Sequence, residues 1–234
     1  MKLKELFESN NITDFSRWSE FGKNFKSLTQ LIDLPEKIHS DFYAGSRYLI
    51  SLEGGPLEVN GNYDCTSNNL SNLIGAPKIL TGSFDCSKNN LNSLQGCPQI
   101  IHDFFRCNKN RLRNFIGGPV SVSGFLSCSS NPLESFEGAP TEIGRHLICQ
   151  RTDLKNLKDI HKHIRRIGGG AADFTFNSIN SHVVGLLLID GLNRVLLDNK
   201  KVEEIINKHL SNGRDVLACI EELEEAGFSQ FAKI

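Results

Sequence analysis

The sequence predicts an α/β fold built around a solenoid of six coils, each 21 residues long, between about Pro35 and Ile160. Three observations predict it. Proline, cysteine and asparagine each recur at an interval of 21 residues, leucines follow the asparagines at that interval, and a glycine stands two residues before each later proline. Self-similarity at one fixed period is typical of stacked units that bury their apolar faces against one another.

The repeat consists of four main series of positions. The prolines are Pro56, Pro77, Pro98, Pro119 and Pro140, preceded by Pro35. The cysteines are Cys65, Cys86, Cys107, Cys128 and Cys149. The asparagines are Asn68, Asn89, Asn110 and Asn131, and the leucines are Leu70, Leu91, Leu112, Leu133 and Leu154. One unit therefore reads Pro-x-x-aliphatic-x-Gly-x-aromatic-x-Cys-x-x-Asn-x-Leu-x-x-Leu-x-Gly-x.

Each part of the unit has a structural role. Inward positions alternate with polar ones from Val59 through Gly61 and Tyr63 to Cys65, which predicts a strand with one buried face. The asparagine suits the following turn, because its amide can hydrogen-bond backbone groups of its own turn and of the neighbouring coil. Stacked coils would form a parallel sheet and place the cysteines in an internal column. Zinc is disfavoured there, since identical side chains on parallel strands all point the same way.

The repeated residues resemble leucine-rich-repeat proteins of the short-coil bacterial and bacteriophage type, in which a strand of the form Phe-x-Cys is followed by Asn-x-Leu-x-x-Leu. The resemblance covers roughly residues 35–160. Cysteine replaces the usual leucine inside the strand, and Arg47 and Thr152 stand where the first and last coils would carry asparagine. The tail after residue 160 contains SHVVGLLLIDGL at 181–192 and a final helix that ends EEAGFSQFAKI. It looks like the C-terminal extension of hypothetical leucine-rich-repeat proteins from tailed phages, and this likeness implies no settled activity.

The two ends of such a solenoid need covering, because its first and last coils expose apolar cross-sections. Helical spacing of apolar residues predicts an N-terminal helical cap over residues 1–34. A small α/β capping segment is expected over residues 161–234. Its elements would be a strand from Asp173 to Phe176, a helix near Ser181 to Ile189, a strand from Arg194 to Leu197, a helix from Asp198 or Asn199 to Leu210, and a last helix from Asp215 to Gly227.

Composition excludes several classes of protein. A net charge of -1 gives no global attraction to nucleic acid or to an anionic membrane. The N-terminus, MKLKELFESNN, lacks the apolar core of a signal peptide, and the longest apolar stretch, Val183 to Ile189, is too short to span a bilayer. We therefore expect a cytoplasmic protein, with no membrane partner and with reduced thiols.

The sequence carries little sign of catalytic chemistry. It lacks a phosphate-binding loop, a nucleophile elbow and a paired-histidine zinc motif. Cys219 fits the apolar spacing of a helix, and His161 and His163 would point to different sides of one. We expect no catalytic residue, no metal site and no cofactor.

The outward strand positions would line a concave sheet face, where solenoids commonly bind partners. Early coils place polar and acidic residues there. Later coils place apolar, aromatic and basic ones, and the candidate partner-binding residues are Phe104, Arg106, Phe125, His146 and Ile148. Aromatic and arginine side chains dominate measured interface energies. The competing interpretation is that the C-terminal segment covers these aromatics or that they are isolated exposed residues.

Two functions follow from these features. The first is a non-enzymatic protein-interaction module, encoded by a phage and acting in the host cytoplasm on a host or phage protein. The second is a nucleic-acid-associated protein that uses the basic segment 155–166, where five basic residues accompany one acid.

Overall fold

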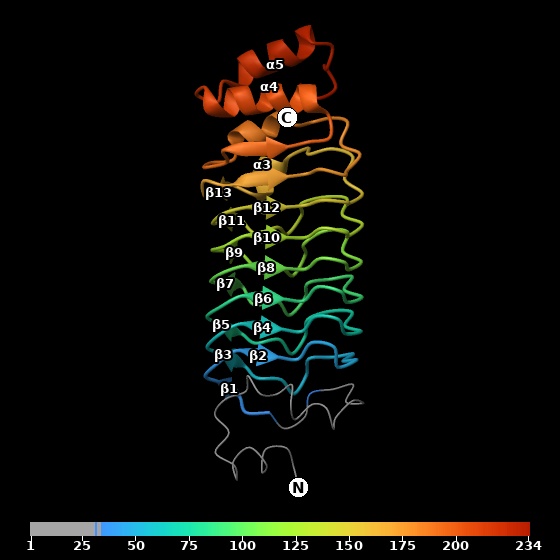
Figure 1. The fold of residues 1–234 in the computed structure, drawn as a ribbon, viewed down its shortest axis with the longest axis vertical. Helices are drawn as coiled ribbons and strands as arrows, with labels where there is room; N and C mark the ends of the chain where they lie inside the picture. The colour runs from blue at the N-terminus through green and yellow to red at the C-terminus, as the bar shows by residue number, and fades with distance from the viewer. Residues whose placement is uncertain (1–30, 32–33) are drawn as a thin grey trace.

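The computed structural model describes residue 31 and residues 34–234. The helical cap expected over residues 1–34 lies outside this part of the chain, apart from Leu31 and Leu34. The described residues form a parallel β-solenoid, a column of coils stacked one on the next (Figure 1). Its regular coils keep the interval of the sequence repeat, since Tyr63 pairs with Phe84 and Phe84 with Phe105.

The larger sheet of the column has eight strands within the described chain, in the order β15-β14-β12-β10-β8-β6-β4-β2. All its neighbouring strands are parallel. The strands are β2 (Phe42–Tyr43), β4 (Tyr63–Asp64), β6 (Phe84–Asp85), β8 (Phe105–Arg106), β10 (Leu126–Ser127), β12 (Leu147–Ile148), β14 (Ala171–Asp173) and β15 (Arg194–Leu196).

A second set of short strands lies before the first in each coil. A three-stranded sheet contains β1 (Lys37–Ile38), β3 (Glu58–Val59) and β5 (Ile79–Leu80). A four-stranded sheet contains β7 (Ile100–Ile101), β9 (Ser121–Val122), β11 (Glu142–Ile143) and β13 (Arg166–Ile167).

The single strand expected from Val59 to Cys65 is therefore wrong, because the chain bends between β3 and β4. Val59, Tyr63 and Cys65 are buried as predicted, but Gly61 lies at the bend. A Cβ at Gly61 would come within 2.7 Å of the backbone nitrogen of Asp41 in the preceding coil. Glycine is needed here for close contact between coils, and this accounts for its place in the repeat.

The core is a set of side-chain columns parallel to the stack. Four aromatic rings follow one another at centroid distances of 5.0, 5.4 and 5.9 Å. They belong to Phe42, Tyr63, Phe84 and Phe105. The repeat cysteines form a second column, as predicted. The thiols of Cys65, Cys86, Cys107 and Cys128 each donate to a carbonyl oxygen of the next coil at 3.4–3.6 Å.

The asparagines close the turn of each coil and join it to its neighbour, as predicted. Asn89 donates its amide hydrogens to the carbonyl oxygens of Cys65 at 3.0 Å and Cys86 at 3.1 Å, and its Oδ1 accepts from the Leu70 nitrogen at 3.1 Å. The residue before it, Lys88, has a left-handed backbone with φ 58°. Asn68, Asn110 and Asn131 repeat these contacts.

The stack continues beyond Ile160, where the repeat in the sequence stops, so the count of six coils was too low. Strands β14 and β15 extend the eight-stranded sheet, pairing Leu147 with Ala172 and Ala172 with Val195. In both pairs the two residues are farther apart in the sequence than the interval of the repeat, so a search for a fixed period does not find these strands. Asn177 occupies the asparagine position of this later coil, donating to the carbonyl oxygen of Cys149 at 2.7 Å.

The C-terminal elements lie at one end of the column (Figure 1). They are α3 (Ile160–His163), the 3-10 helix η3 (Val184–Leu188), α4 (Lys200–Ser211) and α5 (Val216–Glu225). The predicted starts of the two long helices are confirmed, since Asn199 caps α4 and Asp215 caps α5 through their side chains. The predicted strand from Asp173 to Phe176 is β14, which lies earlier in the chain, and the expected helix near Ser181 is the shorter η3.

Helix α4 packs along the last strand of the eight-stranded sheet. The side chain of Asn207 accepts from the Val195 nitrogen at 2.7 Å and donates to the Val195 carbonyl oxygen at 2.8 Å. Glu203 accepts from the Leu197 nitrogen at 2.7 Å, and Lys200 donates to the Leu197 carbonyl oxygen at 3.0 Å. Helix side chains thus take the place of a further strand at this edge.

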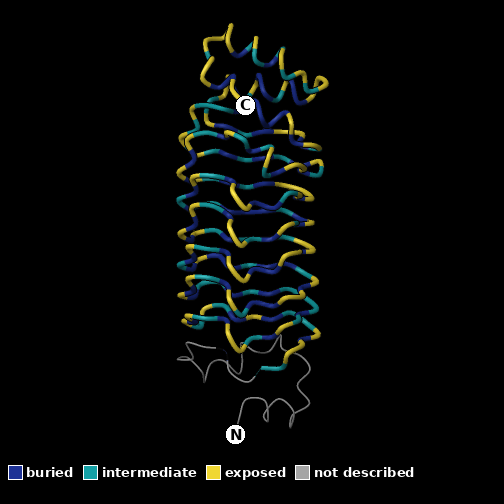
Figure 2. Tube along the Cα trace, turned by 180° about the vertical axis from the view of Figure 1, so that it is seen from behind, coloured by how far each residue is buried: buried dark blue, intermediate teal, exposed yellow. Residues whose placement is uncertain are grey.

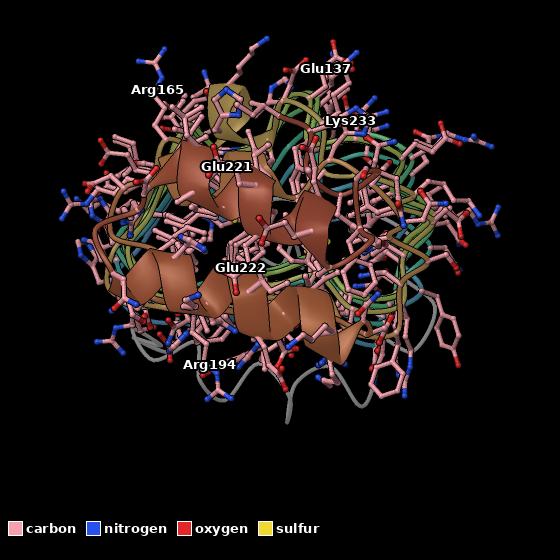
Figure 3. All side chains as sticks on the ribbon, turned by 90° about the horizontal axis from the view of Figure 1, so that it is seen from above. Glu137, Arg165, Arg194, Glu221, Glu222 and Lys233 are labelled. Carbon is pink, nitrogen blue, oxygen red and sulfur yellow. The ribbon has the colours of Figure 1, made fainter. Side chains whose placement is uncertain are left out.

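The column has little curvature. Figure 1 shows the coils rising in a straight stack, and the view along the stack in Figure 3 shows them superimposed beneath α4 and α5. The face expected to be concave is therefore the flat outer face of the eight-stranded sheet. Figure 2 shows the alternation of buried and exposed residues that each coil repeats.

Candidate partner-binding surface

The outer face of the eight-stranded sheet carries one outward side chain from each strand. Parallel register aligns these positions, so that Asp64 lies beside Asp85, Asp85 beside Arg106, and Arg106 beside Ser127. Ser127 lies in turn beside Ile148. The face therefore changes along the column from acidic at Asp64 and Asp85 to basic at Arg106, continues past the buried Ser127 to the apolar Ile148, and is acidic again at Asp173 beside it.

Three of the predicted residues form one cluster, here called the aromatic patch: Phe104, Arg106 and Phe125. The two rings stack at a centroid distance of 5.2 Å with 13° between their planes. The guanidinium carbon of Arg106 lies 4.0 Å from the centre of the Phe104 ring and 4.9 Å from that of Phe125. Both rings are half-buried, so each contacts its neighbours and still exposes part of its surface to solvent.

The two other predicted residues lie farther along the same face. His146 is exposed, and its Nδ1 accepts a hydrogen bond from the Ala171 nitrogen at 3.0 Å, which holds the ring toward the next coil. Ile148 is half-buried and is separated from Arg106 by Ser127. The structure thus joins Phe104, Arg106 and Phe125 directly and places His146 and Ile148 at the margin.

The C-terminal helices do not cover the aromatic patch. Helices α4 and α5 lie beyond β15, whereas the patch belongs to β8, β10 and the turns before them (Figure 1). In Figure 3 the two helices cross the end of the column, and Glu222 lies between them. There its carboxylate accepts from Lys208 at 2.7 Å and contacts His209 at 2.8 Å.

A shallow hollow of about 380 Å³ lies beside the aromatic patch. Its walls come from consecutive coils and include Asp64, Asp85, Lys88, Arg106, Asn108 and Lys109. The Asp64 carboxylate accepts from the Thr66 nitrogen at 2.8 Å, and the Asp85 carboxylate accepts from the Ser87 nitrogen at 3.0 Å. Each of the two carboxylates therefore already accepts a backbone hydrogen bond from the turn that follows it.

The buried thiols are unsuited to nucleophilic chemistry. Burial raises the pKa of Cys86 and of Cys107 well above the ordinary value for a thiol. Burial, with a smaller effect of the Glu222 charge, raises the pKa of Cys219 to about 11. These groups stay protonated at neutral pH, and the thiolate is the reactive form.

Two of the basic residues in the segment 155–166 are paired with acids. Lys162 pairs with Asp159 at 2.9 Å, and Arg166, on β13, pairs with Asp190 at 3.2 Å. His161 lies on α3 with its Nδ1 buried and unpaired, and burial lowers its pKa. The segment runs through α3 to β13, so its basic residues lie on more than one element.

Two kinds of feature are absent from the described part of the chain. No group of three or more histidine, cysteine or acidic side chains there could hold a metal ion. No helix among residues 34–234 is long and apolar enough to cross a membrane.

Sequence reasoning missed three polar residues that organise the C-terminal end of the molecule. Asn177 continues the asparagine series, and its sequence signal was the Asn-x-aliphatic pattern that it forms with Ile179. Asn207 closes the sheet edge. Arg214 donates to the carbonyl oxygens of Leu187, Ile189 and Leu192, and no motif in the sequence marks it.

The fold and the surface define a class of protein: a parallel β-solenoid whose regular coils keep the interval of the sequence repeat, compatible with a leucine-rich-repeat-like fold. Comparison of the chain with protein-family models, with curated proteins and with solved structures found no match.

Proposed function

We propose that the chain is a non-enzymatic protein-interaction module that binds its partner on the outer face of the eight-stranded sheet. The observation that carries this proposal is the aromatic patch, in which the half-buried rings of Phe104 and Phe125 stack with Arg106 against them. Residues of these types lose little conformational freedom when bound and bury a large area. His146 and Ile148 form the margin of the binding surface.

The proposal also covers the type of leucine-rich-repeat protein and the place where it acts. The Phe-x-Cys and Asn-x-Leu-x-x-Leu units support a leucine-rich-repeat protein of the phage type, acting in the host cytoplasm on a host or phage protein. We further propose that α4 and α5, at the end of the segment 161–234, cap the column beyond β15, since α4 packs along that strand through Asn207.

The double substitution Phe104→Ala, Phe125→Ala tests the binding surface. Loss of an interface anchor costs about 2 kcal/mol or more, roughly a thirtyfold loss of affinity. We expect the variant to lose capture of the partner from a host lysate, measured by affinity purification and mass spectrometry. Because both rings are half-buried and stack on each other, we expect a lower thermal midpoint but a chain that still unfolds cooperatively.

Two outcomes would contradict the proposal. A variant that unfolds would mean that the two rings support the fold. A variant that stays folded and still captures the partner would move the site elsewhere. Binding that weakens steeply with salt and depends on Arg165 and Arg166 would instead favour the nucleic-acid function.

A further inference from the structure

We propose that the hollow beside the aromatic patch binds a carboxylate side chain of the partner protein, held by Arg106, Asn108 and the neighbouring lysines. The inference rests on the proposed function, because the carboxylate belongs to the protein that the sheet face binds. The inference specifies which residues of the partner make the contact: an acidic residue with an apolar residue next to it.

Arg106 presents donors that the described structure leaves unused. A guanidinium carries five N–H donors. Its Nη1 forms an ion pair with the Asp85 carboxylate at 3.8 Å, a distance too long for a hydrogen bond, and within the described chain no hydrogen bond of this side chain is seen. The rings of Phe104 and Phe125 support the group at 4.0 and 4.9 Å while 40% of the side chain is exposed. The guanidinium is thus held in position with its donors available to a carboxylate.

Asn108 adds a donor whose orientation is fixed. Its Oδ1 accepts from the Ser127 hydroxyl at 2.8 Å and from the Ser129 nitrogen at 2.7 Å. A backbone nitrogen can only donate, so this amide atom must be the oxygen. The Nδ2 atom, which has no hydrogen-bond partner among the described residues, is therefore the group left for a ligand. It can only donate, which selects an acceptor such as a carboxylate.

Lys88 and Lys109 complete the positive side of the hollow. Both are exposed, both stand at left-handed turn positions of adjacent coils, and both line the hollow. Neither forms an ion pair within residues 34–234. Their ammonium groups can therefore approach a bound anion without losing an existing partner.

The acids on the other side of the hollow favour binding of a single carboxylate side chain over binding of a nucleic-acid backbone, which carries a phosphate at every step. Asp64 and Asp85 would repel successive phosphates laid along the sheet. A protein segment can instead place its acid over Arg106 and a basic side chain over Asp64. These two positions are two strands apart, about 10 Å. The order of charge on the face therefore complements a segment that carries both signs.

The test uses a random peptide library displayed against the full chain, with synthetic copies of the enriched peptides measured by calorimetry. We expect enriched peptides to carry Asp or Glu next to an apolar residue. Changing that acid to its amide should weaken binding about tenfold, and Arg106→Gln on the protein should cause a similar loss. Lys78→Gln removes an exposed charge outside the hollow and serves as the matched control, with affinity unchanged.

Several results would overturn the inference. These are no enriched peptide, enriched peptides without acids, no effect of the acid-to-amide change, an equal loss with Lys78→Gln, or Arg106-dependent binding of an oligothymidylate. If Arg106→Gln lowers the thermal midpoint, the double variant Lys88→Gln, Lys109→Gln replaces it, since both lysines are exposed. Peptides whose binding requires Phe104 and Phe125 but no acid of their own would refute this inference alone. Peptides whose binding requires neither the two phenylalanines nor an acid would refute the proposed function as well.

Discussion

The cysteine side chains form one of the innermost columns of the molecule, and their environment explains why cysteine is accepted in place of a larger residue. Cys86, Cys107 and Cys128 have no exposed surface, and each thiol donates to a carbonyl oxygen of the next coil. A small apolar side chain with a weak donor fits between closely stacked strands. Packing therefore accounts for these residues.

Thiol labelling tests this assignment. We expect a thiol reagent to react slowly with Cys86, Cys107 and Cys128 in native buffer and quickly after denaturation, because the groups are buried and protonated. Mass spectrometry of labelled peptides measures both rates. A cysteine introduced at exposed Ser123 is the control and should react at once. Rapid native labelling of all three core thiols would overturn the inward assignment.

The asparagine side chains are the second residue-scale feature, and each is a link between coils. We expect Asn89→Ala to lower the free energy of unfolding by about 1–3 kcal/mol, because buried backbone groups of Cys65, Cys86 and Leu70 lose their partner. Asn177→Ala should show a similar loss. Chemical denaturation measures both, with exposed Asn92→Ala as the control. An unchanged midpoint for Asn89→Ala would refute the structural role.

At the scale of elements, the edge of the eight-stranded sheet is the feature that most needs protection. An uncovered strand edge offers backbone donors and acceptors to another chain. The Asn207 amide occupies both backbone groups of Val195, while Glu203 and Lys200 occupy those of Leu197. The pairing of α4 with β15 thus ends the sheet.

Asn207→Ala should reopen this edge. We expect a lower thermal midpoint together with association that increases with protein concentration, measured by light scattering during size-exclusion chromatography. Asn212→Ala, at the exposed end of α4, is the matched control and should remain as the parent protein does. If the variant is less stable but does not associate, the Asn207 side chain stabilises the fold through its hydrogen bonds and does not protect the sheet edge.

At the scale of the whole molecule, the column behaves as a stack of interchangeable coils whose contacts are mainly with neighbours. Stability in such a stack is approximately a sum over units and their interfaces. Equivalent residues of successive coils pair in register, as Tyr63 does with Phe84 and Phe84 with Phe105. Removal of a complete unit should therefore preserve the register on both sides.

Deletion of residues 66–86 tests this. The deletion joins Cys65 to Ser87, removes one complete period of the repeat and keeps the aromatic patch. We expect the shortened chain to retain its circular dichroism spectrum and cooperative unfolding with a lower midpoint. Deletion of residues 66–76 removes about half a coil and should prevent folding, because it breaks every side-chain column. Equal behaviour of the two deletions would contradict a register-dependent stack.

The interior of the regular coils could be predicted because each inward residue is decided by local alternation and repeated contacts between neighbours. The fixed period of the repeat was enough to find the buried cysteines and the asparagine turns, and helix-capping residues were enough to place the starts of α4 and α5. The outward positions of Phe104, Arg106 and Phe125 followed from the same alternation. Whether these three side chains touch could not be predicted, because that depends on rotamers and on the packing of three chain segments.

Other features depend on contacts between segments that are distant in the sequence. The bend at Gly61 depends on the backbone of the preceding coil, and the later strands depend on pairing across longer steps that no fixed period reveals. Asn207 acquires its role only when α4 lies along β15. The residues that each coil buries can therefore be predicted from the sequence, because that pattern is local and repeated. Where the stack ends, and which polar groups stay free to bind a partner, depends on contacts between distant segments. No single segment of the sequence contains both sides of such a contact.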